Sequence, residues 1–408
     1  MSLTADALYE SPNALAPHYS RFRVAERLLL TGHSHQAWPD RGLEGQLRAW
    51  HDAAELVDEK WQRVFAVGEK VKAGFARLLD DRTGSYTLGA NTHELVVRFL
   101  SALPLEQRPR LVTTDGEFHS IRRQLDRLAE EGLEIVRLSA GDPARLAERL
   151  AESVDDRTAA VLVSAVLFHN GRIVPELGTV CDAAERHGAA LLVDAYHALC
   201  AIPYSLPAEG LERAFVVGGG YKYCQLGEGN CFLRVPPGCR LRPVITGWYA
   251  EFEVLADRHP AGQVAYGEGA SRFAGSTFDP TSHYRAAEVF ELFREMELTP
   301  TFLRRVSQHQ VGELARAFDR LDADPAIIRR PQVPLAEIGA FLTLDTPHAG
   351  ELYRELKRRG VSTDYRGDKL RFGPAPYLSD VQLRDSIGLL GEALAAVATG
   401  SILSPAAR

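Results

Sequence analysis

The chain has few cysteines, and it lacks the long apolar run that a membrane-spanning helix needs. Its 408 residues include five cysteines, an odd number confined to positions 181 to 239. Their spacing fits neither a metal site nor the framework of a secreted disulfide protein. No apolar run approaches the ~20 residues of a membrane span, and the first residues lack the basic and apolar regions of a secretory signal. We therefore expect a cytoplasmic protein that does not bind a membrane and has no metal site.

A strong net charge is also absent. The formal net charge is −7, with 45% hydrophobic and 25% charged residues, which is ordinary for a globular protein. Mild acidity offers no electrostatic footprint for DNA, RNA or an anionic membrane. A chain of this length exceeds the size at which one core keeps growing, so we expect a large and a small domain.

Lysine is scarce, and one lysine stands apart from the rest. The 47 basic residues include only six lysines, and five of them occupy polar stretches. Lys222 instead follows Ala-Phe-Val-Val-Gly-Gly-Gly-Tyr (214–221), which predicts a buried strand opening into a tight loop. Burial lowers the pKa of a lysine and makes it nucleophilic, as in Schiff-base lysines. The alternative is a lysine that snorkels from a strand end.

A carboxylate follows another apolar segment upstream. Residues 189–193 predict a strand, and Asp194 comes at its carboxyl end, the edge at which open α/β sheets bind ligands. An anion that keeps a pyridine nitrogen protonated and an amine that condenses with an aldehyde are what pyridoxal 5′-phosphate (PLP) requires. The Asp194 and Lys222 pair therefore indicates a PLP site, although Asp194 alone would suit a helix N-cap.

The segments around these two residues carry a family resemblance. Val-Asp-Ala-Tyr-His-Ala (193–198) and Gly-Gly-Gly-Tyr-Lys-Tyr (218–223) resemble the Asp-x-x-His and Gly-Tyr-Lys-Tyr signatures of kynureninase. Kynureninase lies within the class V aminotransferase group of fold-type I PLP enzymes. The resemblance extends from about residue 28 to about residue 395, and it implies PLP as the cofactor. In desulfurases of this group a late cysteine would be expected, and this chain has none after Cys239.

The order of apolar strands and amphipathic helices predicts the architecture. From residue 43 the two types alternate, which favours a doubly wound, mainly parallel α/β sheet. The pattern changes near residue 280 to a long helix and then to a smaller α+β domain. We expect an N-terminal arm with a substrate-side loop (1–45), a large PLP-binding domain (46–282) and a small C-terminal domain (283–408).

Several residues are candidates for holding the cofactor phosphate. A glycine-bearing loop precedes a helix whose first turn presents Thr92 and His93, and backbone donors at a helix N-terminus suit phosphate, although a plain N-cap is the alternative. The resemblance implies that Ser276 and Thr277 reach the site of the other subunit in a homodimer. It also places Trp248 close to the phosphate, although a tryptophan in a loop commonly serves packing.

The cofactor ring needs an aromatic cover, and the loop after residue 114 supplies two candidates. The resemblance favours Phe118, as in kynureninases, and keeps His119 as the competitor, as in desulfurases. His197 would lie near the ring or orient Asp194, although a structural histidine is an equal alternative. The resemblance implies that Tyr221 binds phosphate or transfers a proton.

The substrate carboxylate needs a fixed cation, and the resemblance assigns this role to Arg371. It lies in Lys-Leu-Arg-Phe-Gly-Pro-Ala-Pro-Tyr (369–377), and the planar fork of arginine suits a carboxylate, whereas a surface ion pair is the alternative. His33 and His35 lie in a loop expected to contact substrate. That loop reads His-Ser-His-Gln where kynureninases typically carry an Asn-Ser-Leu-Gly type sequence, so the substrate is not fixed by the resemblance.

The resemblance implies catalysis by Lys222, Asp194 and Tyr221 on an α-amino acid. We expect kynureninase-like hydrolysis of a Cβ–Cγ bond that releases alanine. A class V aminotransferase or related PLP lyase is the second hypothesis, with a cysteine desulfurase disfavoured. A non-catalytic protein that keeps the fold is the third, and the joint presence of Asp194, Lys222 and Arg371 speaks against it.

Overall fold

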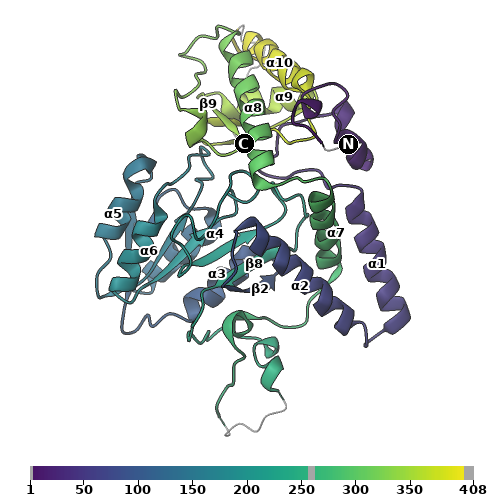
Figure 1. Ribbon diagram of the computed structural model, residues 1–408. Helices are drawn as coiled ribbons and strands as arrows, with labels where there is room; N and C mark the ends of the chain where they lie inside the picture. Colours follow the sequence, from purple (N-terminus) through teal and green to yellow (C-terminus); the bar gives the residue numbers. More distant parts are fainter. Residues whose placement is uncertain (1–2, 256–261, 399–408) are drawn as a thin grey trace, which may run out of the picture.

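The computed structural model describes residues 3–255 and 262–398, which form a large and a small body (Figure 1). A seven-stranded sheet in the order β2-β8-β7-β6-β5-β3-β4 lies at the centre of the large body. All of its strands run in one direction except β8, which is antiparallel to both neighbours. The strands are β2 (Ser85–Gly89), β3 (Arg110–Thr114), β4 (Glu134–Leu138), β5 (Thr158–Ser164), β6 (Ala190–Asp194), β7 (Phe215–Gly219) and β8 (Cys231–Val235).

Helices cover both faces of this sheet because its central strands are apolar on both sides. Every residue of β5 is buried; Val161 and Val163 pack with one set of helices, and Ala160 and Leu162 pack with the other. One face carries α3 (Thr92–Ser101) and α4 (His119–Glu130). The opposite face carries α2 (Trp61–Leu78), α5 (Leu146–Glu152), α6 (Leu177–Arg186) and α7 (Thr281–Glu295). The predicted doubly wound α/β fold is therefore confirmed.

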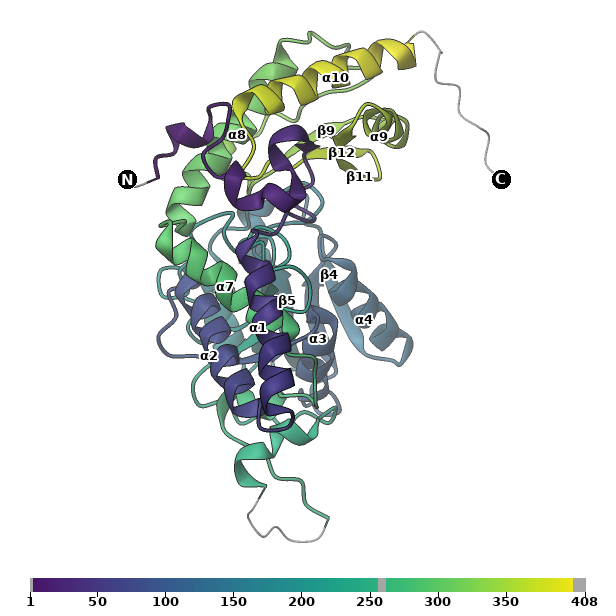
Figure 2. The same cartoon turned by 90° about the vertical axis from the view of Figure 1, so that its right-hand side faces the viewer.

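The small body is a three-stranded antiparallel sheet with helices packed around it. Helix α8 (Pro300–Asp319) rises out of the large body and packs against α10 (Asp380–Ala398), as Figure 2 shows. The sheet has the order β11-β12-β9, and α9 (Ala349–Arg358) lies against it. Its strands are β9 (Leu342–Asp345), β11 (Asp364–Arg366) and β12 (Lys369–Phe372).

A short strand in the N-terminal part of the chain pairs with a strand of the small body. Strand β1 (Leu28–Leu29) runs parallel to β10 (Val361–Ser362), and a further bridge joins Thr31 to Gly373. After this contact the chain enters the large body through α1 (Arg41–Leu56), which packs against α7. The loop 31–37 is therefore fixed between the two bodies.

Most predicted elements lie within a few residues of the observed ones, but two features differ. The stretch that follows the N-terminal arm holds two consecutive helices, α1 and α2, separated at residues 57–60, before the alternation of strands and helices begins. Strand β8 was not predicted, because a short apolar run such as Cys-Phe-Leu-Arg-Val (231–235) does not by itself distinguish a strand from a buried helical segment. The limits of the predicted domains remain a prediction, and α7, beyond the predicted boundary at 282, packs against α1 and α2. Among the described residues, no helix combines the length and hydropathy that crossing a membrane requires.

Candidate active site

The candidate site is a pocket at the carboxyl ends of β5, β6 and β7, on the side of the sheet that faces the small body. Such an edge is where open α/β sheets place their ligands. We call it the Lys222 pocket. It is lined by Thr92, Phe118, Ser164, Val166, Phe168, Asp194, Tyr196, His197, Tyr221 and Lys222.

Lys222 lies in the loop after β7, and its side chain points into this pocket. The residue is 6% exposed, and its Nζ lies 2.6 Å from Nε2 of His197. Burial lowers the pKa of Lys222 to about 7, against the opposing effect of Asp194. Burial and the neighbouring Lys222 also lower the pKa of His197 well below its ordinary value, so this imidazole is neutral. A fraction of the Lys222 amines is therefore uncharged at neutral pH.

Asp194 is the last residue of β6 and lies beside the amine. Its Oδ1 accepts a hydrogen bond of 2.8 Å from the backbone N–H of Tyr196. Burial raises the pKa of Asp194, while that hydrogen bond and the charge of Lys222 lower it. Within residues 3–255 and 262–398 no arginine is hydrogen-bonded to this carboxylate, so it can meet a cationic ring nitrogen.

Aromatic side chains surround the amine, and Phe118 is the candidate ring cover that faces it. The centre of the Phe118 ring lies 5.3 Å from Nζ of Lys222. His119 begins α4 and is exposed, so it does not line the pocket. Phe168, which was not predicted, meets Phe118 edge-on at 5.3 Å. Tyr221 packs against Tyr196 on another side of the amine.

A buried carboxylate that was also not predicted lies under Phe118. Glu117 is 2% exposed and accepts hydrogen bonds from the hydroxyls of Thr114 and Ser164, at 2.6 Å each. Burial raises the pKa of Glu117 to about 7, and the neighbouring Asp194 adds to that shift. Ser164 is the register partner of Asp194 in the sheet, so Glu117 joins the ends of β3 and β5 directly beside Asp194.

The predicted phosphate loop lies at the edge of the pocket. Thr92 lines it, whereas His93 is exposed. The side chain of Asn91 caps α3 by accepting a hydrogen bond of 2.9 Å from the N–H of Glu94. Thr92 is therefore the first helical residue, at the end where the helix dipole and free N–H groups favour an anion.

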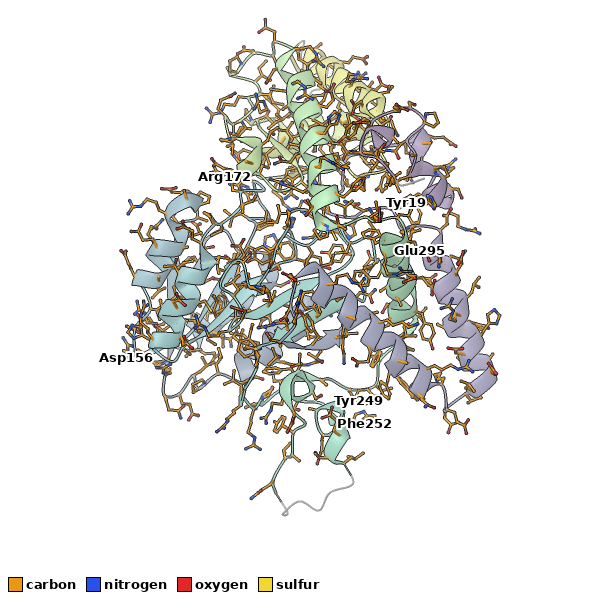
Figure 3. The ribbon with its side chains drawn as sticks, viewed as in Figure 1. Tyr19, Asp156, Arg172, Tyr249, Phe252 and Glu295 are labelled. Carbon is orange, nitrogen blue, oxygen red and sulfur yellow. The ribbon has the colours of Figure 1, made fainter. Side chains whose placement is uncertain are left out.

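The three remaining candidates for phosphate contact lie elsewhere in this subunit. Ser276 and Thr277 line a separate cavity of about 1000 Å³ between α2, β2 and residues 271–283, which lead into α7; we call it the outer cleft. Nε1 of Trp248 donates to Oγ1 of Thr277 at 3.3 Å. Tyr249 and Phe252 also line the outer cleft, at the end of the large body far from the small body (Figure 3).

Arg371 extends from β12 to the boundary between the bodies. It is 3% exposed, and its Nε and Nη2 donate to the two oxygens of Asp364 at 2.8 and 2.6 Å. Its Nη1 donates to the backbone carbonyl of Phe168, which lines the Lys222 pocket. Arg371 is thus adjacent to the pocket and already paired with a carboxylate that was not predicted.

The two predicted histidines of the loop 31–37 have different surroundings. His33 is 1% exposed, stacks on Phe341 at 4.6 Å, and places Nε2 at 2.8 Å from Asp364. It therefore contacts Asp364 rather than the pocket. His35 is exposed and stacks on Tyr221 with ring centres 4.8 Å apart.

The side chains of the Lys222 pocket fit PLP by their chemistry. An amine, a strand-end carboxylate, an aromatic ring and a helix N-terminus face a common space, which are the partners for an aldehyde, a pyridine nitrogen, a ring face and a phosphate. Within the described residues, Nδ1 of His197 is buried and has no hydrogen-bond partner. An additional polar group in this pocket would satisfy it.

Sequence comparison relates the chain to kynureninases. No family model matches it. The kynureninase of Burkholderia pseudomallei (strain 1106a) is 26% identical over 370 residues, covering 86% of this chain and 82% of the relative. The kynureninase of Xanthomonas oryzae pv. oryzae (strain PXO99A) is 27% identical over 386 residues, covering 89% of this chain and 84% of the relative. The resemblance read from the sequence is therefore confirmed.

Comparison of structures shows the fold. A variant of C-DES with glycine covalently linked to its PLP cofactor aligns with a TM-score of 0.77 at 15% identity, covering 92% of this chain and 98% of that one. The apo cysteine desulfurase from Thermococcus onnurineus aligns with a TM-score of 0.73 at 15% identity, covering 91% and 95%. The chain has the fold of fold-type I PLP-dependent enzymes.

Proposed function

We propose that the chain is a PLP-dependent enzyme acting on an α-amino acid, and that it hydrolyses the Cβ–Cγ bond of a kynurenine-like substrate with release of alanine. The observation that carries the proposal is the buried Lys222 amine, with its pKa lowered to about 7 beside the Asp194 carboxylate. Two kynureninases that match more than four fifths of the chain support the choice of reaction.

PLP, when bound, supplies an aldehyde for the amino group and a ring that withdraws electrons from Cα. Lys222 captures the cofactor and takes the proton from Cα of the substrate. Asp194 holds the proton on the pyridine nitrogen, and Phe118 covers the ring. Arg371 binds the α-carboxylate, and Thr92 presents the helix N-terminus to the phosphate.

Tyr221 is the proposed proton donor on the substrate side. Burial raises its pKa to about 12, so the hydroxyl keeps its proton at neutral pH. His35 stacks on its ring and forms the outer wall there. A hydroxyl in this position can supply the proton that Cβ needs when its bond to Cγ breaks, which completes alanine, while water supplies the hydroxyl of the acid that is released.

We also propose that the active form is a homodimer. Ser276 and Thr277 line the outer cleft rather than the Lys222 pocket of their own subunit, and the cleft opens beside the phosphate loop at Gly89 and Ala90. Trp248 and Phe252 pack on each other with ring centres 5.4 Å apart, yet they are 42% and 45% exposed, so they form an apolar surface beside the cleft. A second copy would cover them and bring its Ser276 and Thr277 to the phosphate.

The cofactor is tested by reduction. Purified protein incubated with PLP and borohydride should carry one pyridoxyl group, on Lys222, as read by peptide mass spectrometry. Lys357→Ala, which removes an exposed lysine on α9, is the matched control and should be labelled like the wild type. A protein that stays unlabelled would refute the proposal.

The reaction is tested by its products. Incubation with L-kynurenine should yield anthranilate and alanine in equal amounts. A labelled protein that forms neither, but consumes an amino acid when pyruvate is added, would instead be an aminotransferase. Release of a group from Cβ would identify a lyase, as for C-DES, which is described as a cystine C–S lyase.

A further inference from the structure

Asp364 lies between His33 and Arg371, where the small body meets the Lys222 pocket. In the hairpin of β11 and β12, Asp364 is the register partner of Arg371. Residues opposite each other in an antiparallel pair project from the same face with Cβ atoms about 5 Å apart. The backbone of the hairpin therefore fixes this pair.

The hydrogen bonds of Arg371 leave part of its guanidinium available. A guanidinium has five N–H donors in a rigid plane. Nε and Nη2 each donate to Asp364, and Nη1 donates to the carbonyl of Phe168. One donor on Nη1 and one on Nη2 remain, and a carboxylate accepts two parallel N–H donors.

We propose that Asp364 is a positioning residue that holds Arg371 by its Nε edge, with His33 behind it, so that the remaining N–H donors meet the substrate α-carboxylate. This inference rests on the proposed function and adds the two residues that orient its carboxylate site. It also assigns His33 a role behind Arg371 rather than in contact with substrate.

His33 supports Asp364 as a neutral hydrogen-bond donor. Its side chain is wholly buried, and burial lowers the pKa of His33 to about 4. Its ring packs on Phe341, and its Nδ1 lies close to Gly373, where an added Cβ would come within 2.2 Å of it. Only glycine at that position permits this approach, so the loop and the hairpin are matched in shape.

The pair also limits the effect of Arg371 on the reactive amine. The positive charge of Arg371 lowers the pKa of Lys222, and the negative charge of Asp364 raises it. Because the two charges lie within one bidentate pair, their effects on Lys222 oppose each other. Asp364 therefore both orients the guanidinium and balances its charge.

The test compares two probes in the PLP-loaded protein. L-alanine has an α-carboxylate, and ethylamine is the same molecule without it; binding of each is followed by the absorbance change of the bound cofactor. In Asp364→Ala, L-alanine should bind about tenfold or more weakly, while binding of ethylamine changes less than about twofold. Asp364→Asn keeps one oxygen acceptor, so its affinity for L-alanine should lie between those of the wild type and Asp364→Ala. Asp368→Ala, in the turn of the same hairpin, is the matched control and should behave as the wild type.

Two results would overturn the inference. Equal loss of both probes would mean that Asp364 only supports the fold, and tighter binding of L-alanine would mean that it competes with substrate. Crystal structures of the wild-type and Asp364→Ala apoproteins decide the point without cofactor. A displaced Arg371 supports the positioning role, and an unmoved guanidinium refutes it. Failure of the wild type to bind PLP would refute the proposed function, whereas the apoprotein structures would still show whether Asp364 holds Arg371.

Discussion

Arg234 and Lys222 are both buried cations of the large body, but their surroundings differ. The Arg234 side chain is wholly buried, and it donates to Asp81 from Nε at 2.8 Å and from Nη2 at 3.1 Å. Its Nη1 donates to the backbone carbonyls of Glu212 and Ala214. Lys222 hydrogen-bonds a neutral histidine instead and interacts with Asp194 only through its charge.

The difference in hydrogen bonding separates the structural ion pair of Arg234 and Asp81 from the Lys222 amine, which we propose to be reactive. Burial alone would raise the pKa of Asp81, but hydrogen bonds from Arg234 and Tyr86 and from backbone N–H groups lower it well below the ordinary value. Both charges are thus compensated, and the pair stays ionised. The charge on Lys222 is not compensated to the same degree, so the neutral amine becomes accessible near neutral pH. Incomplete compensation of a buried cation is the physical signal of this site.

Lys222→Ala tests the reactive side of the comparison and should have the largest effect. Turnover should fall by about 10³-fold or more, because the variant lacks the base that takes the Cα proton. The variant should still bind PLP non-covalently, since Asp194, Phe118 and the phosphate loop remain. Steady-state kinetics and equilibrium dialysis of the cofactor measure the two quantities. Full activity would show that Lys222 is not the catalytic lysine.

Asp81→Ala tests the contribution of the buried Asp81–Arg234 ion pair to stability. It leaves Arg234 buried and unpaired, so the stability should fall by about 3–5 kcal/mol. The matched control is Asp126→Ala, which breaks exposed pairs with Arg122 and Arg137 and should cost less than about 1 kcal/mol. Denaturant midpoints of the apoproteins measure both. Similar losses of stability in the two variants would mean that the buried Asp81–Arg234 pair contributes no more than an exposed one.

Glu117→Gln tests the buried carboxylate that lies beside Asp194 and is bonded to Ser164. The folded protein keeps a proton on Glu117 up to a pH of about 7, whereas the unfolded chain loses it near 4.5. Wild-type stability should therefore decrease as the pH rises from about 4.5 to about 7 and level off above that range. The variant should lack this contribution and gain up to about 3 kcal/mol relative to the wild type at pH 8. Denaturation of both apoproteins at pH 5 and pH 8 checks the sign, and an unchanged difference would contradict it.

The pH dependence of PLP capture tests the lowered pKa of Lys222, which is the smallest of the expected effects. Only the neutral amine of Lys222 condenses with the aldehyde, so the capture rate of the apoprotein should rise with pH and reach half its maximum near 7. Because Asp194 raises the pKa of Lys222, Asp194→Asn should move that midpoint to lower pH. Stopped-flow absorbance after addition of PLP gives the midpoint. A value near 10.5, the ordinary lysine pKa, would mean that Lys222 is not reactive in the way proposed.

Much of the fold was predictable because the signal is local. A buried parallel strand is an apolar run, and Asp194 and Lys222 could be placed at strand ends from the residues on either side of them. Strand direction and pairing are not local, so the antiparallel position of β8 between β2 and β7 could not be predicted. Its reversal between β2 and β7 places the turn at Gly229 and Asn230 close to the Lys222 loop, where Gly220 donates to the carbonyl of Asn230.

The residues missed in the site have partners far away in the sequence. Phe168 lines the pocket and Glu117 bonds Ser164 of its lining, both from loops whose positions depend on the whole sheet. Asp364 left a local signal, since Asp-Tyr-Arg-Gly-Asp-Lys-Leu-Arg (364–371) is a hairpin with a glycine in its turn and opposite charges at its two ends. A cross-strand ion pair could have been predicted there.

The pairing of Thr31 with Gly373 and of β1 with β10 has a consequence for biosynthesis. These contacts join residues to partners that are translated more than 300 positions later. The large sheet can close on its own sequence while translation continues, but His33 cannot reach Asp364 until Asp364 has emerged from the ribosome. On the proposed function, the nascent protein therefore holds the Lys222 amine in its pocket before Asp364 can position Arg371.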